Sequence, residues 1–133
     1  MKKVEVVAAI IKNNSSILCC QRESSKLSYL SEKWEFPGGK LEIGETLEQA
    51  LVREINEELE MEIYNLSFAL TVVHQYPDFE LTMHAFYAET KNFNYKLHVH
   101  KKVVWCAIER LNSLDWAAAD IPIIKFLKNP PHK

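Results

Sequence analysis

A Pro-Gly-Gly turn at residues 37–39, followed closely by a long amphipathic helix, constrains this chain more than any other sequence feature. Two of the three glycines in the chain are adjacent in this turn, so we expect backbone angles there that residues with a Cβ atom disfavour. The helix is predicted over 46–60, because Thr46 and Gln49 have the spacing of a capping box. Its apolar side chains recur at four-residue spacing, at Leu47, Leu51, Ile55 and Leu59. A helix with one apolar face must pack on other elements, so the sequence requires a layered fold.

Apolar runs on either side of this helix predict strands. The predicted elements are, in chain order, strands at 4–11, 17–21, 62–75, 79–89 and 102–108, one helical turn at 111–114 and a closing helix at 121–127. Short polar segments separate the first strand from the second and the third from the fourth, which indicates two antiparallel hairpins. The Ser-rich stretch 22–33 is predicted to be a surface loop. The pattern indicates an α+β fold in one domain over 1–133, with a frayed tail at 129–133.

Composition excludes several classes of protein. The chain has 133 residues, 47% of them hydrophobic, and a formal net charge of -2 without a basic block, so we do not expect a long nucleic acid as partner. No apolar stretch approaches the length of a membrane span, so we expect no membrane partner either. The three cysteines form no CxxC pair, which favours a reducing cytoplasm. The oligomeric state is left open.

The helix carries an ordered set of carboxylates. Glu54, Glu57 and Glu58 fall within roughly one 100° sector, because a helix advances about 100° per residue. Their mutual repulsion must be offset by solvent or by a bound cation. Hard divalent cations prefer oxygen ligands, and Mg²⁺ commonly links a few carboxylates to substrate phosphates. The pattern therefore indicates metal-assisted phosphate chemistry, and its alternative is a solvated charged face.

The wider spacing of these residues resembles a known signature. Gly39, Glu45 and the run Arg53-Glu54-Ile55-Asn56-Glu57-Glu58 stand in the register of the Nudix box of nucleoside-diphosphate-linked hydrolases. Residues 34–42 and 44–46 resemble the MutT-like branch, which hydrolyses nucleoside triphosphates and includes enzymes that remove oxidised nucleotides. The resemblance extends from Lys2 to about Leu127. It implies the Nudix fold, an α/β/α sandwich with a mixed β-sheet between helices.

The resemblance also implies a metal site. Glu54, Glu57 and Glu58 would bind Mg²⁺, or Mn²⁺ in its place, with the carbonyl group of Gly38 or Gly39 as a further ligand. One glutamate would also activate water, Glu54 being the first choice and Glu57 the second.

Arg53 would orient these glutamates through a charge-assisted hydrogen bond, either to Glu57 one turn on or to Glu45 across the loop. Its alternative is an ordinary ion pair along the helix. We therefore expect Arg53 to stand beside Glu54 and Glu57 in the catalytic site.

Two positions depart from the family pattern. Glu60 stands where the family usually has a glycine that ends the helix in a left-handed conformation. Val99 aligns with a glutamate ligand of many relatives, and His98 and His100 stand on either side of it. These two histidines could act on metal or phosphate, and the alternative is a pair of exposed strand histidines.

The resemblance places further residues on the substrate, namely Arg22, Glu35, Phe36, Lys40, Asp78 and Asp120. Arg22 and Lys40 would bind phosphates, with a solvated surface charge as the alternative. Phe36 would stack on the base, and Tyr76 or Asp78 in the hairpin turn could close over it. Asp120 would read the base; its alternative role is the N-cap of the closing helix, and the two roles are compatible.

The function that follows is Mg²⁺-dependent hydrolysis of a nucleoside or deoxynucleoside triphosphate, of the 8-oxo-dGTP kind, to the monophosphate and pyrophosphate. Two alternatives remain at this stage. One is a pyrophosphohydrolase of the CTP or dCTP type, because Asp120 replaces an asparagine of MutT itself. The other is a Nudix module that binds nucleotide with little turnover. The small-molecule nucleotide is the only partner that the sequence indicates.

Overall fold

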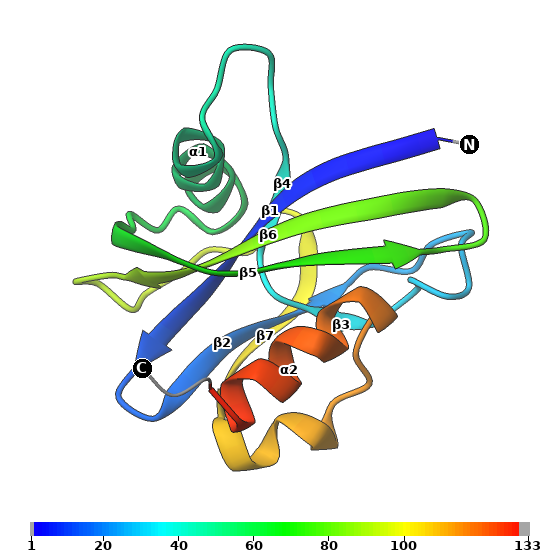
Figure 1. Cartoon of the computed structure of the whole chain (residues 1–133). Helices are drawn as coiled ribbons and strands as arrows, with labels where there is room; N and C mark the ends of the chain where they lie inside the picture. Colours follow the sequence, from blue (N-terminus) through cyan, green and yellow to red (C-terminus); the bar gives the residue numbers. More distant parts are fainter. Residues whose placement is uncertain (1, 131–133) are drawn as a thin grey trace.

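The computed structural model describes residues 2–130 (Figure 1). Its strands are β1 Lys2–Asn13, β2 Ser16–Arg22, β3 Trp34–Glu35, β4 Gly38–Lys40, β5 Tyr64–Gln75, β6 Phe79–Glu89 and β7 His100–Ala107. Its α-helices are α1 Leu47–Leu59 and α2 Ile121–Lys128, and two short 3-10 helices, η1 Ile108–Ser113 and η2 Ala118–Asp120, precede α2. All the predicted strands and helices are confirmed with small shifts of their ends. Of the predicted tail, residues 131–133 lie outside the described residues.

The strands form one mixed sheet. Its order is β3-β2-β1-β6-β5, with β4 also paired to β1 and β7 to β2. β1 and β6 run parallel, and every other pair of these strands is antiparallel. β1 pairs with β2 only at Lys12 and Asn13, whereas its middle, Val6 to Ala8, pairs with β4. β2 separates from β1 after the hairpin. The last residue of β2, Arg22, therefore does not pair with β1, whose middle pairs with β4 instead.

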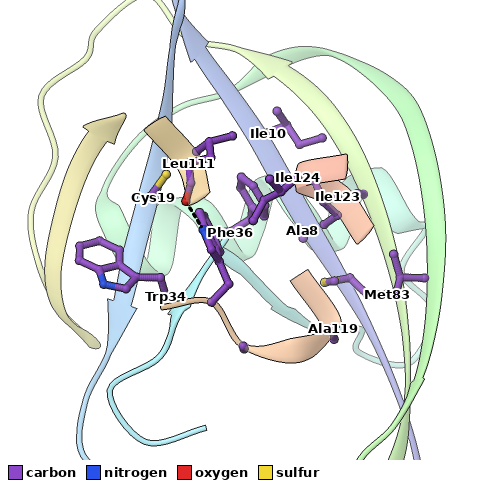
Figure 2. Packing of buried hydrophobic residues seen from close by; sticks show 14 of the residues in the cluster. Ala8, Ile10, Cys19, Trp34, Phe36, Met83, Leu111, Ala119, Ile123 and Ile124 are labelled. Carbon is purple, nitrogen blue, oxygen red and sulfur yellow. Dashed lines mark hydrogen bonds between the residues drawn. The ribbon is translucent and has the colours of Figure 1, made fainter. Parts of the chain in front are cut away.

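Helices cover both faces of the sheet, which confirms the predicted α/β/α sandwich. Alternate residues of β1 point to opposite faces. One set, Val7, Ala9 and Ile11, is buried with the α1 residues Leu51, Ile55 and Leu59. The other, Ala8 and Ile10, is buried with the α2 residues Ile123, Ile124 and Leu127 (Figure 2). A strand covered on both sides is apolar throughout, which explains the unbroken apolar run in the sequence. No helix within residues 2–130 has the length and apolar character needed to span a membrane.

The two glycines of the Pro-Gly-Gly turn serve close packing. Within the described chain a positive φ occurs at only one glycine, Gly44, so our prediction of unusual angles at Gly38 and Gly39 was wrong. Both lie in β4 instead. A Cβ atom on Gly38 would lie 1.9 Å from the backbone oxygen of Val7, and one on Gly39 would lie 1.5 Å from Oε2 of Glu54. The glycines therefore let β4 approach β1 on one side and α1 on the other.

Both ends of α1 follow the prediction. The Gln49 amide donates to Oγ1 of Thr46 at 3.1 Å, and the Thr46 amide donates to Oε1 of Gln49 at 3.0 Å, which completes the capping box. Glu60 ends the helix in the left-handed conformation, with φ 53° and ψ 40°. Its carboxylate also bonds His98 and lies 3.8 Å from Lys96, so it ties the segment before β7 to the end of α1.

Substituting Glu60 separates these two effects. Glu60→Gly relieves the left-handed strain but loses both carboxylate contacts, whereas Glu60→Ala loses the contacts and keeps the strain. We therefore expect Glu60→Gly to be more stable than Glu60→Ala by about 1 kcal/mol, the usual cost of a Cβ atom in this conformation. Urea denaturation of both variants measures the difference. Equal stabilities would mean that the backbone at this position bears no strain.

Candidate active site

A cavity of about 1020 Å³ is lined by residues of β1, β2, β4, β6 and α1. Its polar wall is formed by Gly38, Gly39 and Lys40 of β4 and by Arg53, Glu54 and Glu58 of α1. Its apolar wall includes Val6 and Ala8 of β1, Leu81 and Met83 of β6, and Phe36 and Tyr76. An acidic region thus lies beside an apolar one, which suits a ligand that has both a charged and an uncharged part.

The cavity gathers nearly all residues that the sequence proposes for the site. The predicted residues that line it are Arg22, Glu35, Phe36, Gly38, Gly39, Lys40, Arg53, Glu54, Glu58, Asp78 and Asp120. They come from both hairpins, from β3, β4 and Phe36 between them, from α1 and from the end of η2, so only the fold brings them together. Glu57 is the exception, because its side chain is 57% exposed and does not line the cavity.

Arg53 organises the acidic wall. Its Nε and Nη2 donate to the two carboxylate oxygens of Glu45 at 2.7 and 2.9 Å. Its Nη1 donates to Glu54 at 2.7 Å and to Glu57 at 3.2 Å, and Nη2 also reaches the backbone oxygen of Lys40 at 3.0 Å. Both predicted partners, Glu45 and Glu57, are confirmed. The interpretation of Arg53 as an ordinary helix ion pair is wrong, because one guanidinium joins α1, β4 and the loop between them.

The hydrogen bonds from Arg53 also stabilise the ionised form of Glu45. Together with a bond from the Glu42 amide, they lower the pKa of Glu45 to about 2. Glu45 therefore stays ionised at all ordinary pH values, and it keeps Arg53 turned toward α1.

Glu58 lies inside the cavity wall, not on a solvated face. Burial raises the pKa of its carboxyl group to about 8, and the negative charges of Glu54 and Glu35 add to the rise, while the backbone of Gly38 opposes it. Its Oε1 atom is buried and has no hydrogen-bond partner. The alternative of a solvated charged face is therefore wrong for Glu58.

The raised pKa makes the stability of the metal-free protein depend on pH. Between the ordinary value of 4.5 and about 8, the folded protein holds a proton on Glu58 that the unfolded chain releases. This contribution to stability is present below pH 4.5 and is lost as the pH rises through 8, by at most about 1.4 kcal/mol per pH unit. We expect Glu58→Gln to remove this slope in urea denaturation from pH 5 to 9 with a metal chelator present. An unchanged slope would assign the pH dependence to another group.

The acidic wall has the donor chemistry that a divalent cation requires. Its donors are carboxylate and backbone oxygens, and the buried, unpaired Oε1 of Glu58 is an acceptor that a cation would satisfy. Gly39 lies directly against the carboxylate of Glu54, so its backbone is close to that donor. Within residues 2–130 no three carboxylate, histidine or cysteine side chains form a ready-made metal centre. Arg53 bonds both Glu54 and Glu57, so one guanidinium holds two of the carboxylates predicted as ligands.

A second polar group, made of Arg22, Glu35 and His100, lies at the end of β2, and the sequence named these residues without predicting the bonds between them. Nε2 of His100 donates to Oε2 of Glu35 at 3.0 Å, and Nη1 of Arg22 donates to the other oxygen, Oε1, at 2.9 Å. The side chain of His100 is only 3% exposed, so the interpretation of His98 and His100 as an exposed pair is wrong. His98 lies outside the cavity, on Glu60. The alternating pattern of the sequence does not distinguish the two histidines.

Asp120 lies deep in the cavity wall. It is 5% exposed, and Oδ1 accepts a hydrogen bond from the Phe36 amide at 3.0 Å. Burial raises the pKa of Asp120 well above its usual value, and the charge of Glu35 raises it further. Asp120 occupies the N-cap position of α2, as predicted, but its side chain makes no capping bond to the helix. A buried carboxyl group that keeps its proton can donate a hydrogen bond as well as accept one.

Phe36 offers less of its ring than predicted. The ring is stacked on Trp116, with centroids 4.8 Å apart, and is 3% exposed within the core around Ala8 and Ile124 (Figure 2). It lines the cavity, but a base cannot stack on the face that Trp116 covers.

Two tyrosines connect the 22–33 loop with the β5–β6 turn. Tyr29 stacks on Tyr76 with ring centroids 5.2 Å apart, and its hydroxyl donates to Asp78. The Tyr76 hydroxyl in turn accepts a bond from the Ala119 amide at 2.9 Å. Asp78 is therefore held beside the cavity by Tyr29, a residue of an irregular loop for which the sequence gives no signal.

Comparisons with known proteins agree with this geometry. The family of the NUDIX domain matches residues 6–126. The CTP pyrophosphohydrolase of Escherichia coli (strain K12) is 36% identical over 125 residues, which cover 94% of this chain and 91% of that protein. The 8-oxo-dGTP diphosphatase of the same strain is 31% identical over 128 residues, covering 96% and 98%. Among solved structures, the E. coli ORF135 protein matches with a TM-score of 0.80 at 33% identity and covers 100% of this chain and 96% of that one. The similarity thus includes both walls of the cavity.

Proposed function

Because this chain belongs to the Nudix hydrolase family, we propose that it hydrolyses a nucleoside or deoxynucleoside triphosphate to the monophosphate and pyrophosphate. The observation that carries the proposal is the single cavity that joins an acidic wall to an apolar one. A triphosphate fits the first and a base the second. Two relatives whose names describe pyrophosphate-bond hydrolysis, the CTP pyrophosphohydrolase and the 8-oxo-dGTP diphosphatase, support it.

The acidic wall supplies the reaction chemistry in this proposal. Glu54 and Glu58 of this wall and the neighbouring helix residue Glu57, with the carbonyl group of Gly38 or Gly39, would hold Mg²⁺ or Mn²⁺. A divalent cation bound there offsets phosphate charge and lowers the pKa of water. Glu54 accepts the proton of the attacking water, because it lines the cavity while Arg53 holds one of its oxygens in place. The oxygen of the water forms a bond to phosphorus, and the P–O bond of the α–β bridge breaks in line with the attack, which yields the monophosphate and pyrophosphate.

The remaining residues bind the substrate. Arg22 and Lys40 line the same cavity as the acidic wall and contribute positive charge for the phosphates. Asp120, Phe36 and Asp78 line the part that would receive the base. The proposed substrates are an oxidised purine nucleotide of the 8-oxo-dGTP kind and, as the second candidate, a cytidine triphosphate. The second is favoured by a buried Asp120 whose raised pKa leaves it able to donate to a base.

The test is pyrophosphate release with Mg²⁺ from a panel of normal and oxidised ribo- and deoxynucleoside triphosphates. Glu57→Gln is expected to fold normally and lose most of its turnover, because it weakens the metal site without disturbing the core. The matched control is Glu62→Gln, an exposed glutamate outside the cavity, which should retain full turnover. Absence of release from every nucleotide, with tight binding retained, would contradict hydrolysis and favour a binding module.

Asp120→Asn tests how the base is read. The amide oxygen of asparagine can still accept the Phe36 bond, so the fold should persist. We expect the selectivity, measured as kcat/KM for CTP divided by kcat/KM for 8-oxo-dGTP, to change by about tenfold or more. The kcat for the better of these two substrates should change less. An identical ratio in the variant would show that Asp120 supports the backbone of Phe36 and does not contact the base.

A further inference from the structure

We propose that His100 is a positioning residue that holds Glu35, and through Glu35 the guanidinium of Arg22, in place for the phosphates of the substrate. The inference rests on the proposed function and identifies a residue that supports it. Nothing in the sequence pattern distinguishes His100 from its neighbours, whereas its contacts, its burial and its strand register do.

The three side chains form a continuous bridge. His100 and Arg22 occupy different oxygens of the Glu35 carboxylate, at 3.0 and 2.9 Å. Exposure rises along the bridge, from 3% for the His100 side chain to 22% for Glu35 and 36% for Arg22. The buried imidazole is therefore the fixed end, and the guanidinium is the end that a ligand in the cavity can reach.

A β-bulge produces this arrangement. Gln21 is paired with Lys102, so a regular antiparallel ladder would place Lys101 opposite Arg22. The register shifts between Gln21 and Arg22, and His100 takes that place. Lys101 is then free to bond Glu32 outside the cavity. Bulges commonly redirect a side chain beside a functional site, and this one exchanges a flexible ammonium group for a rigid imidazole.

Unpaired atoms point to a ligand at the same place. The buried side-chain atoms without a hydrogen-bond partner in the described chain are Nε of Arg22, Nδ1 of His100 and Oε1 of Glu58, and all three residues line the cavity. Leaving a buried polar atom unpaired costs free energy, so a bound ligand or water that pairs with Arg22 is favoured.

The hydrogen bonds from His100 and Arg22 also fix the position of the negatively charged Glu35 carboxylate. Glu35 lines the same cavity as Glu58 and Asp120, so its negative charge acts on both walls. With two donors on its carboxylate, Glu35 is held away from the phosphates that Arg22 must bind. Without His100, one oxygen would be free to turn toward them, and the electrostatic attraction for a triphosphate would weaken.

The first experiment compares His100→Leu with His100→Gln. The glutamine amide can place a donor near the position of the imidazole Nε2, so it should restore most of what leucine loses. We expect His100→Leu to raise KM by about tenfold, in line with the loss of one hydrogen bond to a charged group, with kcat changed far less. His98→Leu, the matched histidine outside the cavity, should keep the wild-type KM. An equal KM in His100→Leu and wild type would overturn the proposal.

A double-mutant cycle with Arg22→Ala separates positioning from general damage to the fold. If His100 acts through Arg22, adding His100→Leu to Arg22→Ala leaves KM and the dissociation constant at the values of Arg22→Ala alone. If the two substitutions act independently, their fold-changes multiply in the double variant, and that result would overturn the proposal. The cycle is measured both on KM and on the dissociation constant of the non-hydrolysable α,β-methylene analogue of CTP with Mg²⁺. Absence of turnover in the wild-type protein contradicts the proposed function, and the binding cycle still decides the role of His100.

Discussion

Arg53→Leu is expected to abolish most turnover and to lower the free energy of unfolding by at least about 2 kcal/mol, because it breaks several charge-assisted hydrogen bonds at once. The guanidinium bonds Glu45 twice and also bonds Glu54, Glu57 and the backbone oxygen of Lys40. Leucine would leave these carboxylates close together with no cation between them. Repulsion would then push Glu54 away from its place in the cavity.

Arg53→Lys is the informative companion. Lysine keeps the charge but not the planar fork, so it cannot bond both oxygens of Glu45 and still reach Glu54 and Glu57. We expect it to recover part of the stability and little of the turnover. Urea denaturation and pyrophosphate release, measured on the same preparations, test both statements. Wild-type turnover in Arg53→Lys would mean that charge alone, and not the geometry of the fork, orients the glutamates.

Gly38→Ala is expected to destabilise the protein by about 3 kcal/mol or more, at the upper end of the effects of overpacking. The added Cβ atom would lie 1.9 Å from the backbone oxygen of Val7 and 2.8 Å from the Cα atom of Ala8. These are backbone atoms in the middle of the sheet, and they cannot rotate away as a side chain can. The pairing of β4 with β1 would have to open.

The other two glycines serve as matched controls for this prediction. A Cβ atom on Gly39 meets only the carboxyl end of Glu54, so Gly39→Ala should fold with a smaller loss of stability but displace Glu54 and reduce turnover. A Cβ atom on Gly44 has open space around it, and Gly44→Ala should cost only the strain of its positive φ, about 1 kcal/mol. Thermal unfolding and turnover of the three variants give the comparison. Equal losses of stability at Gly38 and Gly44 would contradict the packing explanation.

Features that depend on local spacing were predictable from the sequence. The capping box at Thr46, the apolar stripe of α1, both hairpins and the left-handed end at Glu60 all depend on residues within a few positions of each other, and each is confirmed. The family was also recognisable from the sequence, because Gly39, Glu45 and residues 53–58 lie at fixed spacings within one continuous segment of the chain.

The properties that depend on distant neighbours required the tertiary structure. Glu58 and Glu57 are adjacent on one helix, yet only Glu58 lines the cavity, and the pKa of Glu58 is raised by burial and by charges that include Glu35 from elsewhere in the chain. His98 and His100 differ for a similar reason, since a bulge opposite Arg22 turns one of them inward. The sequence by itself determined which elements form and the motif that names the family. The tertiary structure decided which side chains of those elements are buried, paired and charged, because burial and electrostatic interaction depend on what packs against a residue and not on its position along the chain.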